Sequence, residues 1–474
     1  MIAWVIVYFC VFRGVKSSSY VVWVTVPLPI ILVIILVIRG STLDGASDGI
    51  DLYLNGEDTV NSNKALEDDK MWSDATGQIF FTLSICMGVM TSYGSYNKPT
   101  KPVILDSFVI ALVNSSVSFI SGFAVFSTIG YLRHINSPVS SQMTSFGLAF
   151  IAYPTAASTM SGANFWNLLL FTTLFLLGID SAFSMVEAIA TVIYDTPLGR
   201  RMNRMVIAAI LCIFCGLWSL AFCADVGLVL LDVVDYYTNT YMLQILGVLQ
   251  PFAVGWVYEQ DVMAERVGWA SLLTYNVGFW VSTELPIIIA IFGIDKKVWI
   301  GVIIMFALYI LVFIVSWKLS KLTFKEFIKL LPFSGVRKIA RHMTLLTDLE
   351  QDEQERSKWA YVFEFWWCFS IKYFLPVCIS ILLFLSLHTD IDENYGDYPT
   401  GTQWIGRTLV IIFVILIVAP IFFCTTAEDF ELEVDRPYEE MRGADILKVA
   451  KDREERERAA EKPQEGAGED PGNV

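Results

Sequence analysis

The most constraining feature of this sequence is a series of hydrophobic runs, each about 20 residues long, that recur along nearly the whole chain. A run of that length crosses the hydrocarbon core of a bilayer as an α-helix. The composition agrees, because 55% of the residues are hydrophobic and only 17% are charged. A soluble protein of this composition would expose too much apolar surface. The sequence therefore predicts an all-α, polytopic membrane protein.

We expect about eleven spans, with no sizeable soluble domain between them. The predicted spans lie near residues 2–12, which is short, and then near 21–38, 78–96, 107–132, 165–194, 205–223, 228–258, 270–292, 299–317, 363–387 and 404–424.

The net charge of −15 is distributed unevenly over the loops. If successive loops alternate sides, one side collects most basic residues, namely Arg13, Lys16, Lys98, Lys101, Arg200, Arg201, Arg204 and the stretch 318–341. The other side collects the acidic loops 44–69 and 388–399. Because cytoplasmic loops carry an excess of Lys and Arg, the basic side is predicted to be cytosolic, and the C-terminus ends there. The charge pattern thus indicates topology, and we expect no nucleic-acid partner.

Two charged segments near the C-terminus differ in character. Residues 323–343, TFKEFIKLLPFSGVRKIARHM, are basic and amphipathic, and lie either on the anionic inner leaflet or in solvent as a connector helix. Residues 426–474 are highly charged and end in a stretch that cannot bury enough apolar surface to fold. We expect the end of this tail to be disordered.

Asp180 is a carboxylate in the middle of the span predicted near residues 165–194, within the stretch LFLLGIDSAF. A charge at that depth costs a few kcal/mol, so such groups usually face a bundle interior or an ion path. Leu177 and Ser181 share its helix face, which groups a carbonyl, a carboxylate and a hydroxyl. These are hard oxygen ligands of the kind that alkali and alkaline-earth cations prefer. The alternative is a structural carboxylate paired with a basic residue, but we identify no Lys or Arg at mid-depth in the spans.

Two other spans carry polar residues four positions apart, Gln78 with Thr82 and Asn114 with Ser118. Each pair presents an amide and a hydroxyl from one helix face, which suits a cation or an anion such as chloride. Interhelical hydrogen bonding is the alternative for any one pair, but three such faces favour a shared hydrophilic site. The stretch LSICMG at 83–88 also predicts a helix break, which would free backbone carbonyls at mid-membrane.

These motifs resemble those of the neurotransmitter:sodium symporters. WSDATGQIFFTLSICMGVMTSYGSYNK, DSFVIALVNSSVSFISGFAVFSTIGY and LLFTTLFLLGIDSAFSMVEAIATVIYD resemble the family's sixth, seventh and eighth helices. GLAFIAYPTA resembles the extracellular loop before the eighth helix, and WVIVYFCVFRGVKSS with RGSTLDGASDGIDLYL resemble helices four and five. The resemblance extends to about residue 258 and resumes with WWCFSIKYFLP and the final span as helices eleven and twelve.

The resemblance implies roles for residues at matching positions. The implied sodium ligands are Leu177, Asp180 and Ser181 at one site, with Thr82 and Asn114 at another. The implied chloride ligands are Gln78, Thr82, Asn114 and Ser118. Substrate-pocket positions are Phe81, Ser84, Met87, Ser181 and Met185, and gate positions are Asp235 on the outside with Tyr96 and Asp195 on the inside.

The departures from the family are equally specific. Helices one to three have no counterpart, so the expected fold is a LeuT-type helical bundle without them. Neither gate is expected to keep its arginine partner. We therefore divide the chain into helices four to ten at 1–258, an additional two-helix insertion at 259–322, a basic cytosolic connector at 323–358, helices eleven and twelve at 359–425, and the charged tail at 426–474.

The implied function is sodium-coupled, chloride-dependent symport of an amino acid or related small amine by alternating access. The coupling ions are sodium and chloride, with no other cofactor, and the partners are the small substrate and the lipid bilayer. We expect this chain to be an N-terminally truncated fragment that does not transport alone, with the plasma membrane as its location. The alternative is a non-transporting truncated member or interaction protein. An enzyme is not expected, because no HExxH motif or paired catalytic Asp is present.

Overall fold

The computed structural model describes residues 1–56, 69–98, 101–137, 147–197, 199–293, 298–347, 358–392 and 395–423. In these residues all regular secondary structure is helical. The described part contains nine helices that are long and apolar enough to span a membrane. The other two of the eleven expected spans are the short helix at Ile2–Val11 and a broken helix at residues 69–95. The prediction of an all-α polytopic membrane protein is confirmed.

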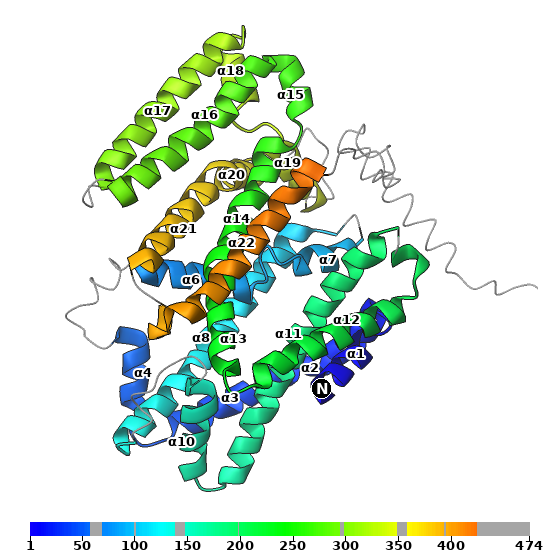
Figure 1. Cartoon of the computed structure of the whole chain (residues 1–474), viewed down its shortest axis with the longest axis vertical. Helices are drawn as coiled ribbons and strands as arrows, with labels where there is room; N and C mark the ends of the chain where they lie inside the picture. The colour runs from blue at the N-terminus through cyan, green and yellow to red at the C-terminus, as the bar shows by residue number, and fades with distance from the viewer. Residues whose placement is uncertain are drawn as a thin grey trace, which may run out of the picture.

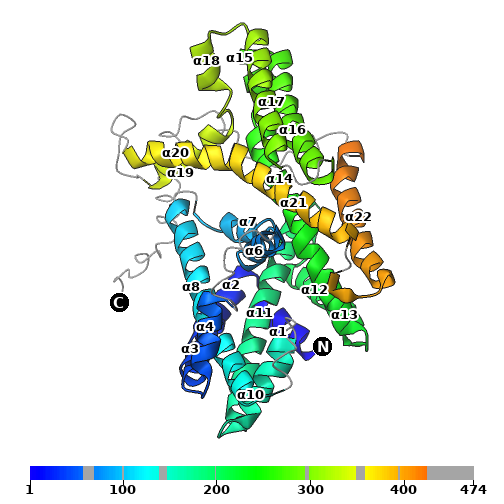
Figure 2. The same cartoon turned by 90° about the vertical axis from the view of Figure 1, so that its left-hand side faces the viewer.

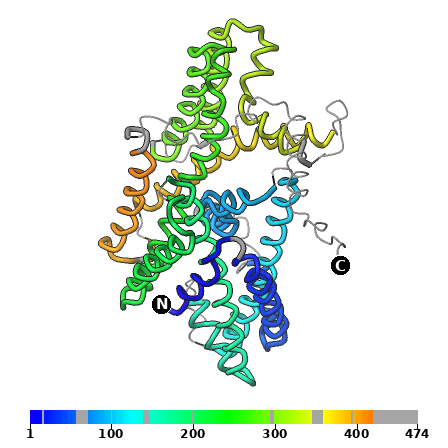
Figure 3. Tube along the Cα trace, turned by 90° about the vertical axis from the view of Figure 1, so that its right-hand side faces the viewer, coloured from blue at the N-terminus to red at the C-terminus, as the bar shows by residue number. Residues whose placement is uncertain are grey.

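The first helices pack against later parts of the chain. The N-terminal helix α1 (Ile2–Val11) contacts α11 (Ala163–Asp195) and α12 (Arg204–Trp218), and can be followed from the dark blue end of the trace in Figure 3. Helices α3 and α4 lie along α8 because glycines remove side chains from the contact. A methyl group at Gly49 would overlap the Phe126 carbonyl oxygen, so only glycine allows this approach. The elements are α2 (Val15–Thr25), α3 (Pro27–Ser41), α4 (Ala46–Asn55) and α8 (Val103–His134).

The predicted break after Thr82 is confirmed. Helix α6 (Asp69–Thr82) ends there, and six residues separate it from α7 (Val89–Ser95). Between them Ser84, Cys86 and Gly88 adopt positive φ angles of 51°, 63° and 76°, which continue neither helix. The break therefore leaves backbone groups outside regular helical hydrogen bonding within a predicted span.

The central helices follow as a long, packed series. Helix α11 runs unbroken through Asp180 and packs on α12, α10 and α7 (Figure 1). The span Gly227–Val257, which follows α12, contains two π-helical turns. The elements are η2 (Leu148–Ala152), α10 (Tyr153–Thr159), α11 (Ala163–Asp195), η3 (Gly199–Arg201), α12 (Arg204–Trp218), η4 (Ser219–Cys223), α13 (Gly227–Tyr237), η5 (Thr238–Met242), α14 (Leu243–Phe252), η6 (Ala253–Val257) and α15 (Gln260–Val267).

The last helices form a hairpin, α16 with α17, and a long run, α20 with α21, that contact each other. Helices α16 and α17 form a hairpin that packs against α21, and Figure 2 shows α20 and α21 as one long run beside it. Helix α21 in turn packs on α6 and α14, while α22 packs on α13. The elements are α16 (Trp269–Ile288), η7 (Ile289–Gly293), α17 (Val298–Leu319), α18 (Phe324–Leu330), α19 (Val336–Thr347), α20 (Lys358–Phe369), η8 (Ser370–Phe374), α21 (Leu375–Asp392), η9 (Tyr395–Asp397) and α22 (Thr400–Phe423).

The basic connector is two short helices, α18 and α19, separated by a turn. Thr323 and Glu326 form a capping box that starts α18. Phe327 and Leu331 are fully buried in a cluster around Trp256, which attaches this connector to the preceding span. The expected disorder of the tail concerns residues that lie outside the described ones.

Candidate ion and substrate site

Asp180 lies on α11 and faces α2. Its Oδ1 accepts a hydrogen bond from the Thr25 hydroxyl at 2.8 Å. The Asp180 side chain is half-buried, and among the described residues no Lys or Arg lies within ion-pair distance of it. A carboxylate and a hydroxyl are hard oxygen donors that suit an alkali cation, which would supply the missing positive charge.

The other two expected ligands on α11 are differently placed. Leu177 and Ser181 share the helix face of Asp180 through their spacing, but both side chains are exposed. The structure instead brings Thr25 to Asp180, a residue that the sequence analysis did not select. A lone threonine in an apolar run usually indicates helix packing, so nothing in the local pattern distinguished it.

Thr82 and Asn114 meet across two helices. The Thr82 hydroxyl donates to the Asn114 side-chain oxygen at 3.2 Å, which joins the end of α6 to the middle of α8. Gln78 and Ser118, each one turn away, are exposed, and their side chains make no hydrogen bond within the described part of the chain. Of the four expected chloride ligands, the structure brings two into contact.

The expected substrate residues fall into two groups. Phe81, Ser84 and Met87 lie at the end of α6 and in the break that follows, while Ser181 and Met185 lie on α11. Met87 packs against the buried cluster of Phe80 and Leu243. Helix α7 packs on α11, so the break lies close to the helix that carries Asp180. No hydrogen bond between described side chains joins the two groups.

Tyr96, one of the two expected inner-gate residues, contacts a basic residue. Arg204, the first residue of α12, forms an ion pair with Glu187 at 2.5 Å, and its guanidinium also donates to the Tyr96 hydroxyl. Tyr96 is further bonded to Thr191 on α11, at 3.0 Å. The expectation of missing arginine partners concerned Asp195 and Asp235, and the Arg204 ion pair is with neither of them. Asp195, the other expected gate residue, is exposed and makes no ion pair with a described residue.

The outer gate region contains carboxylates bonded by tyrosines. Asp232, three residues before Asp235 on α13, accepts hydrogen bonds from Tyr398 at 2.8 Å and Tyr395 at 3.2 Å. Burial and the Asp232 carboxylate raise the pKa of Tyr395, so this hydroxyl remains a donor at neutral pH. Asp235 itself is exposed and forms no ion pair with a described residue. In the described residues, the Tyr395 and Tyr398 hydroxyls are thus the partners of its neighbour Asp232.

Lys372 contradicts the expectation that the spans lack a basic residue at depth. This side chain is 1% exposed and lies in η8, within the span that begins at Lys358. Its Nζ donates to the Ser334 hydroxyl at 3.1 Å and lies 4.8 Å from the centre of the Trp256 ring. It therefore anchors the connector turn and does not neutralise Asp180.

Comparison with known proteins assigns the chain to a family. Residues 1–303 match the sodium:neurotransmitter symporter family. The chain belongs to this family. The matched range includes α16, which the sequence analysis set apart as an insertion, and it ends before α20. This match confirms the predicted membership. The members of this family are transporters.

Several curated family members resemble the chain over part of their length. The sodium- and chloride-dependent taurine transporter of Rattus norvegicus is 34% identical over 294 residues, which cover 61% of this chain and 46% of the relative. The sodium- and chloride-dependent neutral and basic amino acid transporter B(0+) of Homo sapiens is 33% identical over 302 residues, covering 62% and 46%. The sodium- and chloride-dependent GABA transporter 2 of Rattus norvegicus is 37% identical over 267 residues, covering 54% and 43%. The chain therefore spans less than half the length of these relatives.

Proposed function

We propose that the protein acts in sodium-coupled, chloride-dependent symport of an amino acid or related small amine across the plasma membrane, by alternating access. The observation that carries this proposal is Asp180, a carboxylate within a membrane span whose described partner is one hydroxyl. A group in that position needs a positive charge, and a sodium ion supplies it only while bound. Binding of the ion can then be coupled to the state of the surrounding helices.

The proposed sodium ligands are the α11 set, Leu177, Asp180 and Ser181, together with Thr82 and Asn114. Thr25 supports the first set, because its hydroxyl orients the carboxylate through the 2.8 Å bond. For sodium to use Leu177 and Ser181 as well, a further helix has to approach their exposed face. That requirement makes the site sensitive to helix movement, as alternating access demands.

The proposed chloride site is built on the contact between Thr82 and Asn114. Hydroxyl and amide groups can donate to an anion, and Gln78 and Ser118 lie one helical turn from this contact. An anion bound there would connect the end of α6 to α8. The site therefore couples chloride to the helix that breaks directly after Thr82.

The substrate class follows from the relatives and from the position of the break. The relatives carry names for taurine, GABA, and neutral and basic amino acids, all small molecules with an amine. We propose that Phe81, Ser84, Met87, Ser181 and Met185 line the substrate pocket. Asp235 on the outside, with Tyr96 and Asp195 on the inside, would close it in turn. Arg204 supports the inner closure because it joins Tyr96 to the buried Glu187.

The test is binding of labelled taurine, GABA and neutral amino acids to the reconstituted chain. We expect at least one of them to bind in sodium chloride and not in potassium chloride or sodium gluconate. Asp180→Asn should abolish the sodium dependence, whereas Asp225→Asn, an exposed aspartate before α13, should leave it unchanged. Binding that is indifferent to sodium, or absent for every substrate, would contradict the proposal.

A further inference from the structure

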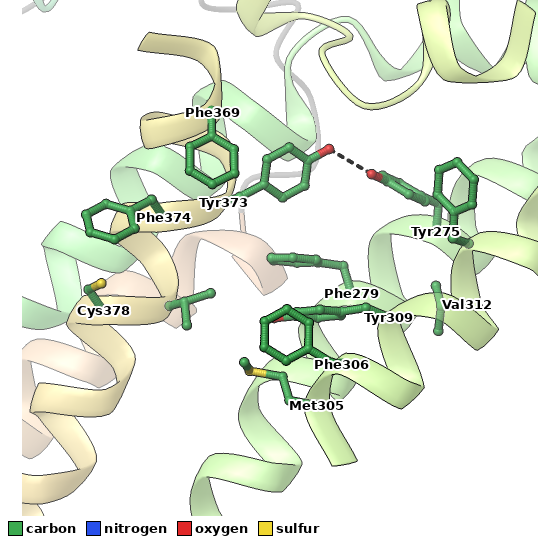
Figure 4. Close-up of a pocket in the computed structure, with 12 residues that line it drawn as sticks. Tyr275, Phe279, Met305, Phe306, Tyr309, Val312, Phe369, Tyr373, Phe374 and Cys378 are labelled. Atoms are coloured by element: carbon green, nitrogen blue, oxygen red, sulfur yellow. Dashed lines mark hydrogen bonds between the residues drawn. The ribbon is translucent and has the colours of Figure 1, made fainter. Parts of the chain in front are cut away.

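An apolar cavity of about 450 Å³ lies between the α16–α17 hairpin and the run from α20 to α21. Its size falls in the range of small-molecule pockets. Figure 4 shows Phe369 and Cys378 facing Phe279, Phe306 and Met305 across it. The helices on both sides are candidate membrane spans, so the cavity lies within the membrane.

The polar atoms of the lining are already bonded to protein groups. The hydroxyls of Tyr275 and Tyr373 lie 2.7 Å apart, as the dashed line in Figure 4 shows, and Tyr373 also donates to the Pro332 carbonyl at 2.5 Å. The Tyr309 hydroxyl is 2.7 Å from that of Thr283. The cavity therefore presents rings, alkyl groups and sulfur, and its complement at this depth is hydrocarbon.

The cavity is accessible from the lipid phase. Phe306 on α17 and Phe374 in η8 both line it, with side chains that are 58% and 55% exposed. In a bilayer, surfaces at this depth contact acyl chains. A lipid chain can therefore enter sideways without passing through water.

A second cavity, of about 240 Å³, lies at the connector end of the same helices. Lys329 and Arg337 line it, both exposed, and neither side chain has an ion pair or hydrogen bond with a described residue. The one carboxylate in the lining is the buried Glu364, whose Oε1 accepts a hydrogen bond from Thr344 at 2.9 Å. The two cations give this end a site for an anion.

A continuous set of rings connects the two cavities. Phe333 and Phe365 line the second cavity with ring centres 5.6 Å apart, and Phe365 stacks on Phe369 of the first at 6.4 Å. From Phe365 to Cys378 the helix rises by about 20 Å, at about 1.5 Å per residue. One leaflet, headgroup region included, is about 20 Å thick, so the two cavities together span a distance that suits a single lipid with its phosphate at one end.

We propose that the two cavities form one binding site for an anionic glycerophospholipid. Its phosphate lies between Lys329 and Arg337, and an acyl chain fills the apolar cavity beside Cys378. A free phosphate would use only the second cavity, and a neutral lipid would leave the two cations unpaired. The bound lipid would join the hairpin to α21 and to the connector. This inference does not depend on transport.

The first test measures lipid retention by the full chain. The chain is reconstituted with vesicles of equal parts phosphatidylcholine and phosphatidylserine, extracted, and weighed by native mass spectrometry. We expect one phosphatidylserine retained in preference to phosphatidylcholine, and Lys329→Ala with Arg337→Ala to weaken its affinity about thirtyfold. The matched control is Lys318→Ala with Lys325→Ala, which removes two exposed charges, one at the end of α17 and one in α18, that do not line the cavity. An equal loss in both variants would overturn the proposal.

A second measurement uses the unmodified chain and so does not depend on the folding of a variant. Phosphatidylserine with a diazirine at the end of an acyl chain is photolysed in the same vesicles, and the crosslinked peptide is identified. We expect crosslinks at Met305, Phe306 or Cys378, and their loss on addition of unlabelled phosphatidylserine but not of inorganic phosphate. Crosslinks elsewhere, equal retention of both lipids, or displacement by phosphate alone would refute the site.

Discussion

Helix α11 carries two carboxylates in the membrane, Asp180 and Glu187, and they are neutralised differently. Glu187 is 1% exposed and has its counter-charge in the chain, as the ion pair with Arg204. Asp180 is half-buried, and its described partner is the Thr25 hydroxyl. Two carboxylates on one helix thus have different partners among the described residues. A carboxylate with a built-in cation holds helices together, whereas one without it can bind a cation from solution.

The largest predicted effect concerns the carboxylate with the built-in cation. Glu187→Gln leaves Arg204 without a counter-charge in a largely buried position, which should destabilise the protein by about 3 kcal/mol. Thermal unfolding of the purified chain in lipid nanodiscs measures this. The double variant Glu187→Gln with Arg204→Gln should lose less than the sum of the two single variants, since it removes both charges. Additive losses would show that the two side chains do not act as a pair.

A second prediction concerns the space that Arg204 occupies. Gly14 has a φ of 67°, and a Cβ there would lie 2.5 Å from the Arg204 guanidinium carbon. Gly14→Ala should therefore displace this guanidinium from Glu187 and destabilise the protein by about 2 kcal/mol in the same assay.

The matched control is Gly56→Ala. Gly56 has a φ of 77°, but a Cβ there would meet nothing within 4 Å. This variant should show the backbone effect alone, about 1 kcal/mol. If both variants lose the same stability, the contact with Arg204 contributes nothing.

Part of the candidate site was predictable from the sequence. Asp180 was found because a lone charge interrupts an apolar run, and the break at 83–88 because small residues follow a polar pair. The contact of Arg204 with Tyr96 was not predicted, because Arg204 starts α12 and bonds back to Tyr96 and Glu187 on other helices. Lys372 interrupts the predicted span 363–387 as visibly as Asp180 interrupts its own, and it was overlooked; only its partners, connector groups about forty residues away, are not revealed by a local pattern.

The smallest predicted effect comes from removing the Thr25 hydroxyl, which orients the Asp180 carboxylate. Thr25→Val keeps the side-chain volume but removes the hydroxyl, a change worth about 1 kcal/mol of hydrogen bonding. Because sodium can still bind the carboxylate, we expect its affinity to fall about fivefold, without a change in its selectivity over potassium. A sodium titration of thermal unfolding measures this, with Thr25→Ser as the control that keeps the hydroxyl. Equal effects of the two substitutions would exclude the hydroxyl as the cause.

Whether Asp180 holds a cation from solution is tested most directly by the thermal unfolding of the chain as sodium replaces potassium at constant ionic strength. We expect a saturable stabilisation by sodium, about 1.4 kcal/mol at ten times its Kd. Asp180→Asn should remove this stabilisation while it leaves unfolding in potassium nearly unchanged, because the amide oxygen can still accept from Thr25. An unaltered sodium response in Asp180→Asn, or an equal response to potassium in the unmodified chain, would contradict the account.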